Sequence, residues 1–224
     1  QWGKCAVTGE EFSSTHEIHC HHKLPRYLGG DDSYGNLILV KDSVHKLIHA
    51  INADTIAKYL EYLIESFMFS EAKRYDVKGK KYFEYPLKYY CTDVGLRNAR
   101  LNFRQQEETH IMENIIYNEL IIRGYSVDVG VVEIIENAEG KKRRKQCEID
   151  FVVNMGARRY YIQSALSVSD PDKMTTELRP LKNTKDFFKK IIISKSNAKP
   201  WIDEDGIVHI GLYDFLLNQN SLEL

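Results

Sequence analysis

The alternation of apolar and polar residues predicts a small, strand-rich unit at the beginning of the chain. Two short runs are typical of strands, residues 16–22 (THEIHCH) and 36–40 (NLILV), and a loop rich in proline and glycine separates them. Asp42 is a suitable N-cap for a helix that carries His45 and His49. We therefore expect the first fifty residues to fold as strand, loop, strand and helix.

Helical spacing of apolar residues resumes after Asp54, in the segment TIAKYLEYLIESFMF. The following segment, RYDVKGKKYFEYPLKYY, is typical of a hairpin that turns at Lys78-Gly79, and a helix followed by a basic hairpin resembles half of a winged helix. The remaining pattern predicts a helix, three strands, a helix, two strands and a short C-terminal helix. The predicted ranges are 107–123, 126–135, 146–153, 158–166, 171–188, 191–194 and 207–211, with a basic turn, KKRRK, between the first two strands.

The elements predict an α+β chain of three parts. A small ββα unit covers residues 1–54, a partial winged-helix segment covers 55–92, and an α/β domain covers 93–224. The chain begins with Gln1 rather than Met, so we expect it to be a fragment of a longer protein.

Composition limits the partners. No apolar run approaches the length of a membrane span and no leader opens the chain, which favours a cytoplasmic protein without a membrane partner. The net charge of -1 means that nucleic-acid binding must depend on local basic segments. The four cysteines lie far apart and do not form a disulfide framework or a four-cysteine zinc site.

Histidines are concentrated in the first unit, which holds six of the eight. His45 and His49 are four residues apart, so both rings lie on one face of the predicted helix and can bind one divalent ion. His21 and His22 are adjacent on a strand and point to opposite faces, so one can bind the ion while the other faces the substrate. Asn36 offers a side-chain carbonyl that can hold a histidine ring in one tautomer.

The segment IHCHHKLPRYLGGDDSYGNLILVKDSVHKLIHA resembles the HNH endonuclease domain that ends group II intron reverse transcriptases, over about residues 3–54. The resemblance implies a Gly29-Gly30 turn and one divalent metal ion, with Mn, Zn, Ni and Mg as candidates. It implies these roles: His22 as general base, Asn36 as its orienting residue, and His21, His45 and His49 as metal ligands. His22 would accept a proton from the water that attacks the phosphorus.

The resemblance has one departure. The intron domains usually carry two cysteine pairs for a structural zinc, whereas Cys5 is here followed by Thr8 and the second pair is absent, so we expect that zinc to be lost. The alternative is a purely structural zinc site in which Cys5 or Cys20 joins His45 and His49. His16 and His19 are expected to be surface or packing residues.

The predicted order of helix, three strands, helix and strand matches the core of the PD-(D/E)XK nuclease fold. Glu113, Glu148 and Asp150 occupy its acidic positions, but Gln163 and Ala165 stand where an acid and a lysine are expected, which predicts a vestigial, inactive site. Residues 55–217, through segments such as DVGLRNA, MENIIYNELIIRGY and EIDFVV, resemble the C-terminal domain of unknown function of prokaryotic AAA-type ATPases. The chain therefore looks like a chimera, either a natural fusion or an artefact of assembly.

Basic residues in three places are candidate DNA contacts. They are Arg26, Lys73, Arg74, Lys80, Lys81, Lys141, Lys142, Arg143, Arg144 and Lys145. The alternative for the KKRRK run is a solvated turn.

These observations predict a metal-dependent HNH-type DNA endonuclease with an inactive restriction-nuclease-like second domain. The alternative is a non-catalytic DNA- or protein-binding fragment of an AAA-type ATPase with a remnant HNH unit. The expected partner is DNA, and the resemblances add intron RNA or an upstream ATPase or reverse transcriptase module.

Overall fold

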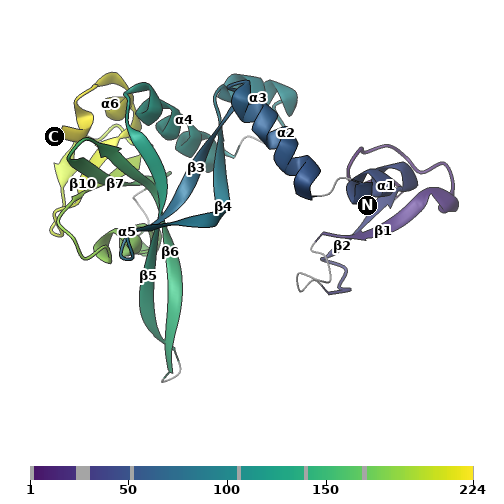
Figure 1. Ribbon diagram of the computed structural model, residues 1–224, viewed down its shortest axis with the longest axis horizontal. Coiled ribbons are helices and arrows are strands. Elements are labelled where there is room, and N and C mark those ends of the chain that lie inside the picture. The colour runs from purple at the N-terminus through teal and green to yellow at the C-terminus, as the bar shows by residue number, and fades with distance from the viewer. Residues whose placement is uncertain are drawn as a thin grey trace. The chain divides into compact units, whose positions relative to one another are not determined.

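The computed structural model describes residues 3–23, 31–50, 53–104, 107–138, 141–167 and 171–223. The chain divides into two compact units, residues 1–62 and 63–224, each built from helices and strands (Figure 1). The predicted α+β class is thereby confirmed. Within the described ranges, no helix is both long and apolar enough to cross a membrane.

The first unit has the predicted order of strand, strand and helix. A short 3-10 helix, Thr15–Glu17, precedes β1 (Ile18–His22), which pairs antiparallel with β2 (Leu37–Lys41). The helices α1 (Asp42–Ala50) and α2 (Ala53–Glu65) follow, and the division between the units falls near the end of α2.

The second unit is organised around an eight-stranded sheet with the order β4-β3-β5-β6-β7-β8-β10-β9. Its strands are β3 (Phe69–Asp76), β4 (Lys81–Cys91), β5 (Ser126–Ala138), β6 (Lys141–Met155), β7 (Arg158–Ala165), β8 (Lys189–Ser194), β9 (Trp201–Ile202) and β10 (Val208–Gly211). Its helices are α3 (Val94–Arg100), α4 (Glu108–Ile122), α5 (Pro171–Lys182) and α6 (Leu212–Leu217), and a 3-10 turn, Ser221–Glu223, follows.

Two hydrophobic cores cover the two faces of this sheet. The first includes Ile116 and Leu120 of α4 and Phe215 of α6, all fully buried, and the second includes Leu181 of α5. The strands β6 and β7 contribute to both cores because successive strand residues point to opposite faces. The predicted run of helix, three strands, helix and strand is confirmed as α4, β5, β6, β7, α5 and β8.

Several predictions of local structure were wrong. The hairpin of β3 and β4 does turn at Lys78-Gly79, but it is not a separate winged segment, because β3 pairs in parallel with β5 and joins the large sheet. The KKRRK run is not a turn: residues 141–145 begin β6 and pair with the end of β5. The helix predicted over 171–188 ends at Lys182, and α3, which Asp93 caps by accepting a hydrogen bond from the Leu96 amide at 2.9 Å, was not predicted.

A β-bulge lies in the centre of the sheet. Asp128 pairs with Val152 and Gly130 pairs with Ile149, so β6 contains one more residue than β5 over this stretch. Gly130 allows the close packing, because a Cβ atom there would lie 2.8 Å from Val152 Cγ2 and 2.9 Å from Ile149 Cβ. The bulged stretch of β6 contains Asp150, one of the predicted site residues.

Candidate functional site

The first candidate site is a group of histidines on one face of the first unit. His21 of β1 lies edge-on to His45 of α1, with ring centroids 5.5 Å apart, and His19 stacks on His45 at 4.9 Å. His19 Nε2 also lies 3.0 Å from Asp42 Oδ1. Sequence reasoning placed His19 outside the site, whereas the alternation of β1 brings it to the same face as His21.

Part of the set predicted for this unit is not described. The side chain of His49, together with Arg26 and the Gly29-Gly30 turn, lies outside the described residues. Among the side chains that the structure does describe, no group of three or more His, Cys, Asp or Glu is arranged to hold a metal ion.

His22 points away from the histidine group and meets a carboxylate. Its Nε2 lies 2.7 Å from Asp32 Oδ1. Asn36, the predicted orienting residue, donates from its side-chain amide to the Asp31 backbone carbonyl at 2.7 Å. The backbone carbonyl of Asn36 accepts a hydrogen bond from the Lys23 backbone amide. Asp32 was missed because the loop before it has no regular period, although a carboxylate ten residues after a candidate base was visible in the sequence.

Cys5 is buried in the first unit, and its thiol takes part in several hydrogen bonds. Burial acts to raise the pKa of its thiol, but hydrogen bonds from the Thr8 side chain and from backbone amides of Thr8, Lys41 and Val7 lower that pKa to about 7. Thr8 therefore serves as a hydrogen-bond partner of the Cys5 thiol. Cys20 is exposed and lies on the strand face opposite His19 and His21.

The second candidate site is a carboxylate cluster in the second unit. Glu113 of α4 and Glu148 of β6 are bridged by Lys88 of β4, whose Nζ lies 2.6 Å from Glu113 Oε1 and 2.9 Å from Glu148 Oε1. Arg74 of β3 holds the other oxygen of Glu148 at 2.6 Å. The Tyr90 hydroxyl donates to Glu113 Oε1 at 2.7 Å.

Asp150 and Gln163 extend this cluster through the sheet. Asp150 Oδ2 accepts a hydrogen bond from the Ser164 amide at 2.8 Å, and the Asp150 amide donates to Gln163 Oε1 at 3.3 Å. Gln163 in turn donates from its side-chain amide to Glu177 Oε2 of α5 at 2.8 Å. The structure thus links the four residues predicted for this site, with Lys88, Tyr90 and Glu177 as further members.

Burial and charge set the protonation of the cluster. Burial and the neighbouring charge of Glu113 raise the pKa of Asp150 to about 8. Burial also acts to raise the pKa of Glu148, but Lys88 and Arg74 outweigh it and hold that pKa below its ordinary value. Burial acts to lower the pKa of the Lys88 ammonium, yet Glu113 and Glu148 raise it above the ordinary value. At neutral pH, Asp150 is therefore mainly neutral and Lys88 is charged.

Lys88 was missed by sequence reasoning, which looked for a lysine on β7 only. A signal was present, since Lys88 is two residues from Tyr90 in an apolar strand and must share its face. Arg74, predicted to contact DNA, is instead half-buried against Glu148, whereas Lys73, Lys80 and Lys81 are exposed.

The remaining basic candidates lie on a two-stranded arm. The neighbouring strands flank only part of β5 and β6: β3 pairs with β5 over residues 129–131, and β7 pairs with β6 over residues 151–155. Beyond these pairings, β5 and β6 pair with each other for seven more residue pairs, from Val132 with Cys147 to Ala138 with Lys141. Figure 1 shows this β5–β6 arm extending from the sheet. Arg143, Arg144 and Lys145 are exposed on it, and Arg144 lies 3.5 Å from Glu133; the side chains of Lys141 and Lys142 lie outside the described residues.

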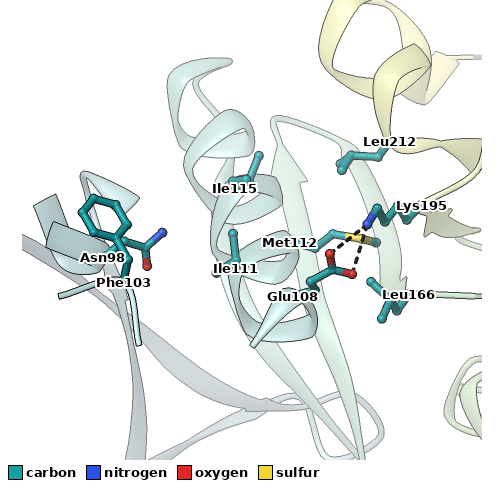
Figure 2. Close-up of a pocket in the computed structure, with 9 residues that line it drawn as sticks. All are labelled: Asn98, Phe103, Glu108, Ile111, Met112, Ile115, Leu166, Lys195 and Leu212. Atoms are coloured by element: carbon teal, nitrogen blue, oxygen red, sulfur yellow. Dashed lines mark hydrogen bonds and ion pairs between the residues drawn. The ribbon is translucent and has the colours of Figure 1, made fainter. Parts of the chain in front are cut away.

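An apolar pocket of about 340 Å³ lies between α4 and the residues that follow β7 and β8 (Figure 2). Its wall includes Met112, Leu166 and Leu212, and the Lys195 ammonium binds both carboxylate oxygens of Glu108 at 3.0 Å across it. The charged groups of this pocket therefore neutralise each other, which leaves a mainly apolar lining.

The structure defines a two-unit α+β protein with a histidine group in one unit and a buried carboxylate cluster in the other. A domain of unknown function, DUF8612, matches residues 26–107. An uncharacterized protein of Haemophilus influenzae is 35% identical over 163 residues, which are 73% of this chain and 37% of that protein. The chain therefore spans little more than a third of the length of that curated relative. No solved structure matches the chain.

Proposed function

We propose that the first unit is a metal-dependent DNA endonuclease of the HNH type. The observation that carries this proposal is the opposite orientation of His22 and His21 on β1, which separates a candidate base from the candidate metal ligands. His22 contacts Asp32, and His21 lies beside His45. Adjacent residues of a strand point to opposite faces, so His21 can bind a metal ion on one face while His22 acts as a base on the other.

Asp32 gives His22 the tautomer that a general base needs. An ionised carboxylate only accepts hydrogen bonds, so Nε2 of a neutral His22 carries the hydrogen and donates it to Asp32 over 2.7 Å. The lone pair then lies on Nδ1, which accepts the proton of a water molecule as its oxygen attacks the phosphorus. Asp32 acts through His22, as a positioning residue.

The histidine group suits one divalent ion. His21, His45 and His49 would hold it, and nitrogen donors suit Zn, Ni or Mn better than Mg. When bound, such an ion stabilises the negative charge that develops on the phosphorane and on the departing oxygen. His19, stacked on His45 and paired with Asp42, fixes the orientation of the His45 ring.

The β5–β6 arm is the proposed DNA contact of the second unit. Its seven residue pairs span about 20 Å at roughly 3.3 Å per residue, and a two-stranded ribbon of this kind fits the major groove of DNA. Arg143, Arg144 and Lys145 are exposed on the arm and would contact phosphates. The match to DUF8612 runs through residues 51–54, where the two predicted parts meet, which supports a natural joining of the two units.

A nicking assay tests the proposal. Metal-stripped protein is incubated with supercoiled plasmid and resupplied with Mn²⁺, Mg²⁺ or Zn²⁺. We expect metal-dependent nicking that His22→Ala abolishes and that Asp32→Asn lowers by about 10–100-fold, the usual effect of removing an orienting partner. Asp32→Glu should restore part of the loss, because it returns an acceptor-only group. The matched control is His16→Ala, which removes an exposed histidine of the 3-10 helix.

The second candidate function is a non-catalytic DNA- or protein-binding fragment. The observation that favours it is the internal pairing of the second unit's carboxylates with Lys88 and Arg74. Equal inactivity of wild type and His22→Ala, with DNA and metal binding intact in both, would refute the endonuclease and leave this second candidate.

A further inference from the structure

The carboxylate cluster of the second unit contains its own cations. The Lys88 ammonium lies between carboxylates from two different elements, 2.6 Å from Glu113 and 2.9 Å from Glu148. Arg74 neutralises the second oxygen of Glu148 at 2.6 Å. Two positive charges therefore face two negative charges within direct contact.

The other polar groups of the cluster are also engaged internally. Glu113 Oε1 accepts from both Tyr90 and Lys88, and Gln163 accepts from the Asp150 amide while donating to Glu177. An ion that approached Glu113 and Glu148 would have to displace a charged, half-buried amine that holds both.

We propose that Lys88 is a built-in cation that takes the place of a divalent metal ion between Glu113 and Glu148, so that the native second unit binds no metal ion there. Carboxylates from separate elements, brought together around one positive charge, form the kind of oxygen environment that Mg²⁺ and Mn²⁺ occupy in proteins. The lysine ammonium is a compact point charge and can serve the same electrostatic role without a free coordination position.

The proposal carries a direct consequence for variants of Lys88. A neutral side chain of similar length leaves Glu113 and Glu148 with only Arg74 as a counter-charge, and the vacated space is open to an external cation. Loss of Lys88 should therefore create a divalent-metal site where the native protein has none. This inference concerns the second unit and holds whether or not the first unit cuts DNA.

Manganese binding to the 224-residue chain tests it. Every sample carries His45→Ala to remove the histidine site of the first unit, and free Mn²⁺ is measured by electron paramagnetic resonance. We expect Lys88→Met to bind one Mn²⁺ at least tenfold more tightly than the Lys88 parent does, and Glu148→Gln added to Lys88→Met to cancel the gain. Lys88→Arg is the matched control, because it keeps the charge and should show no gain.

Thermal unfolding supplies a second readout. Metal-free Lys88→Met should unfold at a lower temperature than its parent, and millimolar Mn²⁺ should restore the loss. Three results would each overturn the proposal: Mn²⁺ binding by the parent that Glu113→Gln removes, no gain in Lys88→Met, or a loss of thermal stability that Mn²⁺ leaves unchanged.

Discussion

Replacing Asp150 by asparagine should stabilise the protein at neutral and alkaline pH, although it removes a buried group in the centre of the sheet. Asp150 is only 9% exposed, and its pKa is raised from 3.8 to about 8 by burial and by Glu113. Asparagine keeps an oxygen that can accept the hydrogen bond of the Ser164 amide but carries no charge.

Proton binding determines whether Asp150 stabilises or destabilises the fold as the pH changes. Between about pH 4 and pH 8 the folded protein keeps the Asp150 proton while the unfolded chain releases it, so the stabilisation present below pH 4 is lost as the pH rises to 8. A difference of one in the pKa between the folded and unfolded states changes the free energy of unfolding by about 1.4 kcal/mol. The rise from 3.8 to about 8 therefore limits the contribution of Asp150 to about 5 kcal/mol. We expect Asp150→Asn to reduce this slope and to gain on the order of 2 kcal/mol over wild type at pH 8, well within that limit. Asp128 and Glu177, whose pKa values are also raised by burial, keep the remainder of the slope.

Urea unfolding at pH 5, 6, 7 and 8, followed by circular dichroism, measures the slope. Glu204→Gln is the matched control, because Glu204 is an exposed carboxylate of the same unit and its removal should leave the slope unchanged. A variant that is less stable than wild type at every pH, with the slope retained, would refute the reasoning and show that an ionised Asp150 stabilises the fold.

Two further predictions concern the bulge and the β5–β6 arm. Gly130→Ala should destabilise the second unit by about 1–3 kcal/mol, because its Cβ atom would overlap the side chains across the bulge; an unchanged urea midpoint would show that the bulge is not tightly packed. The double change Arg143→Ala and Arg144→Ala should weaken DNA binding and reduce the slope of log affinity against log salt by about 0.9 for each phosphate that the variant no longer neutralises. The control is the double change Arg100→Ala and Lys199→Ala, which removes two exposed basic residues outside the arm and should leave the DNA affinity measured by fluorescence anisotropy unchanged. An equal loss of affinity in both double variants would indicate that the arm has no specific role.

Sequence alone determined the elements that depend on local chemistry. The strand, strand and helix of the first unit, the run from α4 to β8 in the second, the turn at Lys78-Gly79 and the opposite orientation of His21 and His22 follow from spacing over a few residues, because backbone geometry repeats with short periods. The helix α3 and the short strand β9 were not predicted from that spacing. Local reasoning failed at the KKRRK run, where composition favoured a turn and pairing with β5 made a strand.

Tertiary structure decided how the candidate sites are completed. Lys88 meets Glu113 and Glu148 from 25 and 60 residues away in the chain, and Asp32 contacts His22 from ten residues away. The bulge opposite Gly130 lies where Asp150 enters the cluster. Such contacts depend on the order of strands in the sheet and on the packing of α4 and α5 against it. A short-range pattern of apolar and polar residues predicts neither the strand order nor the helix packing.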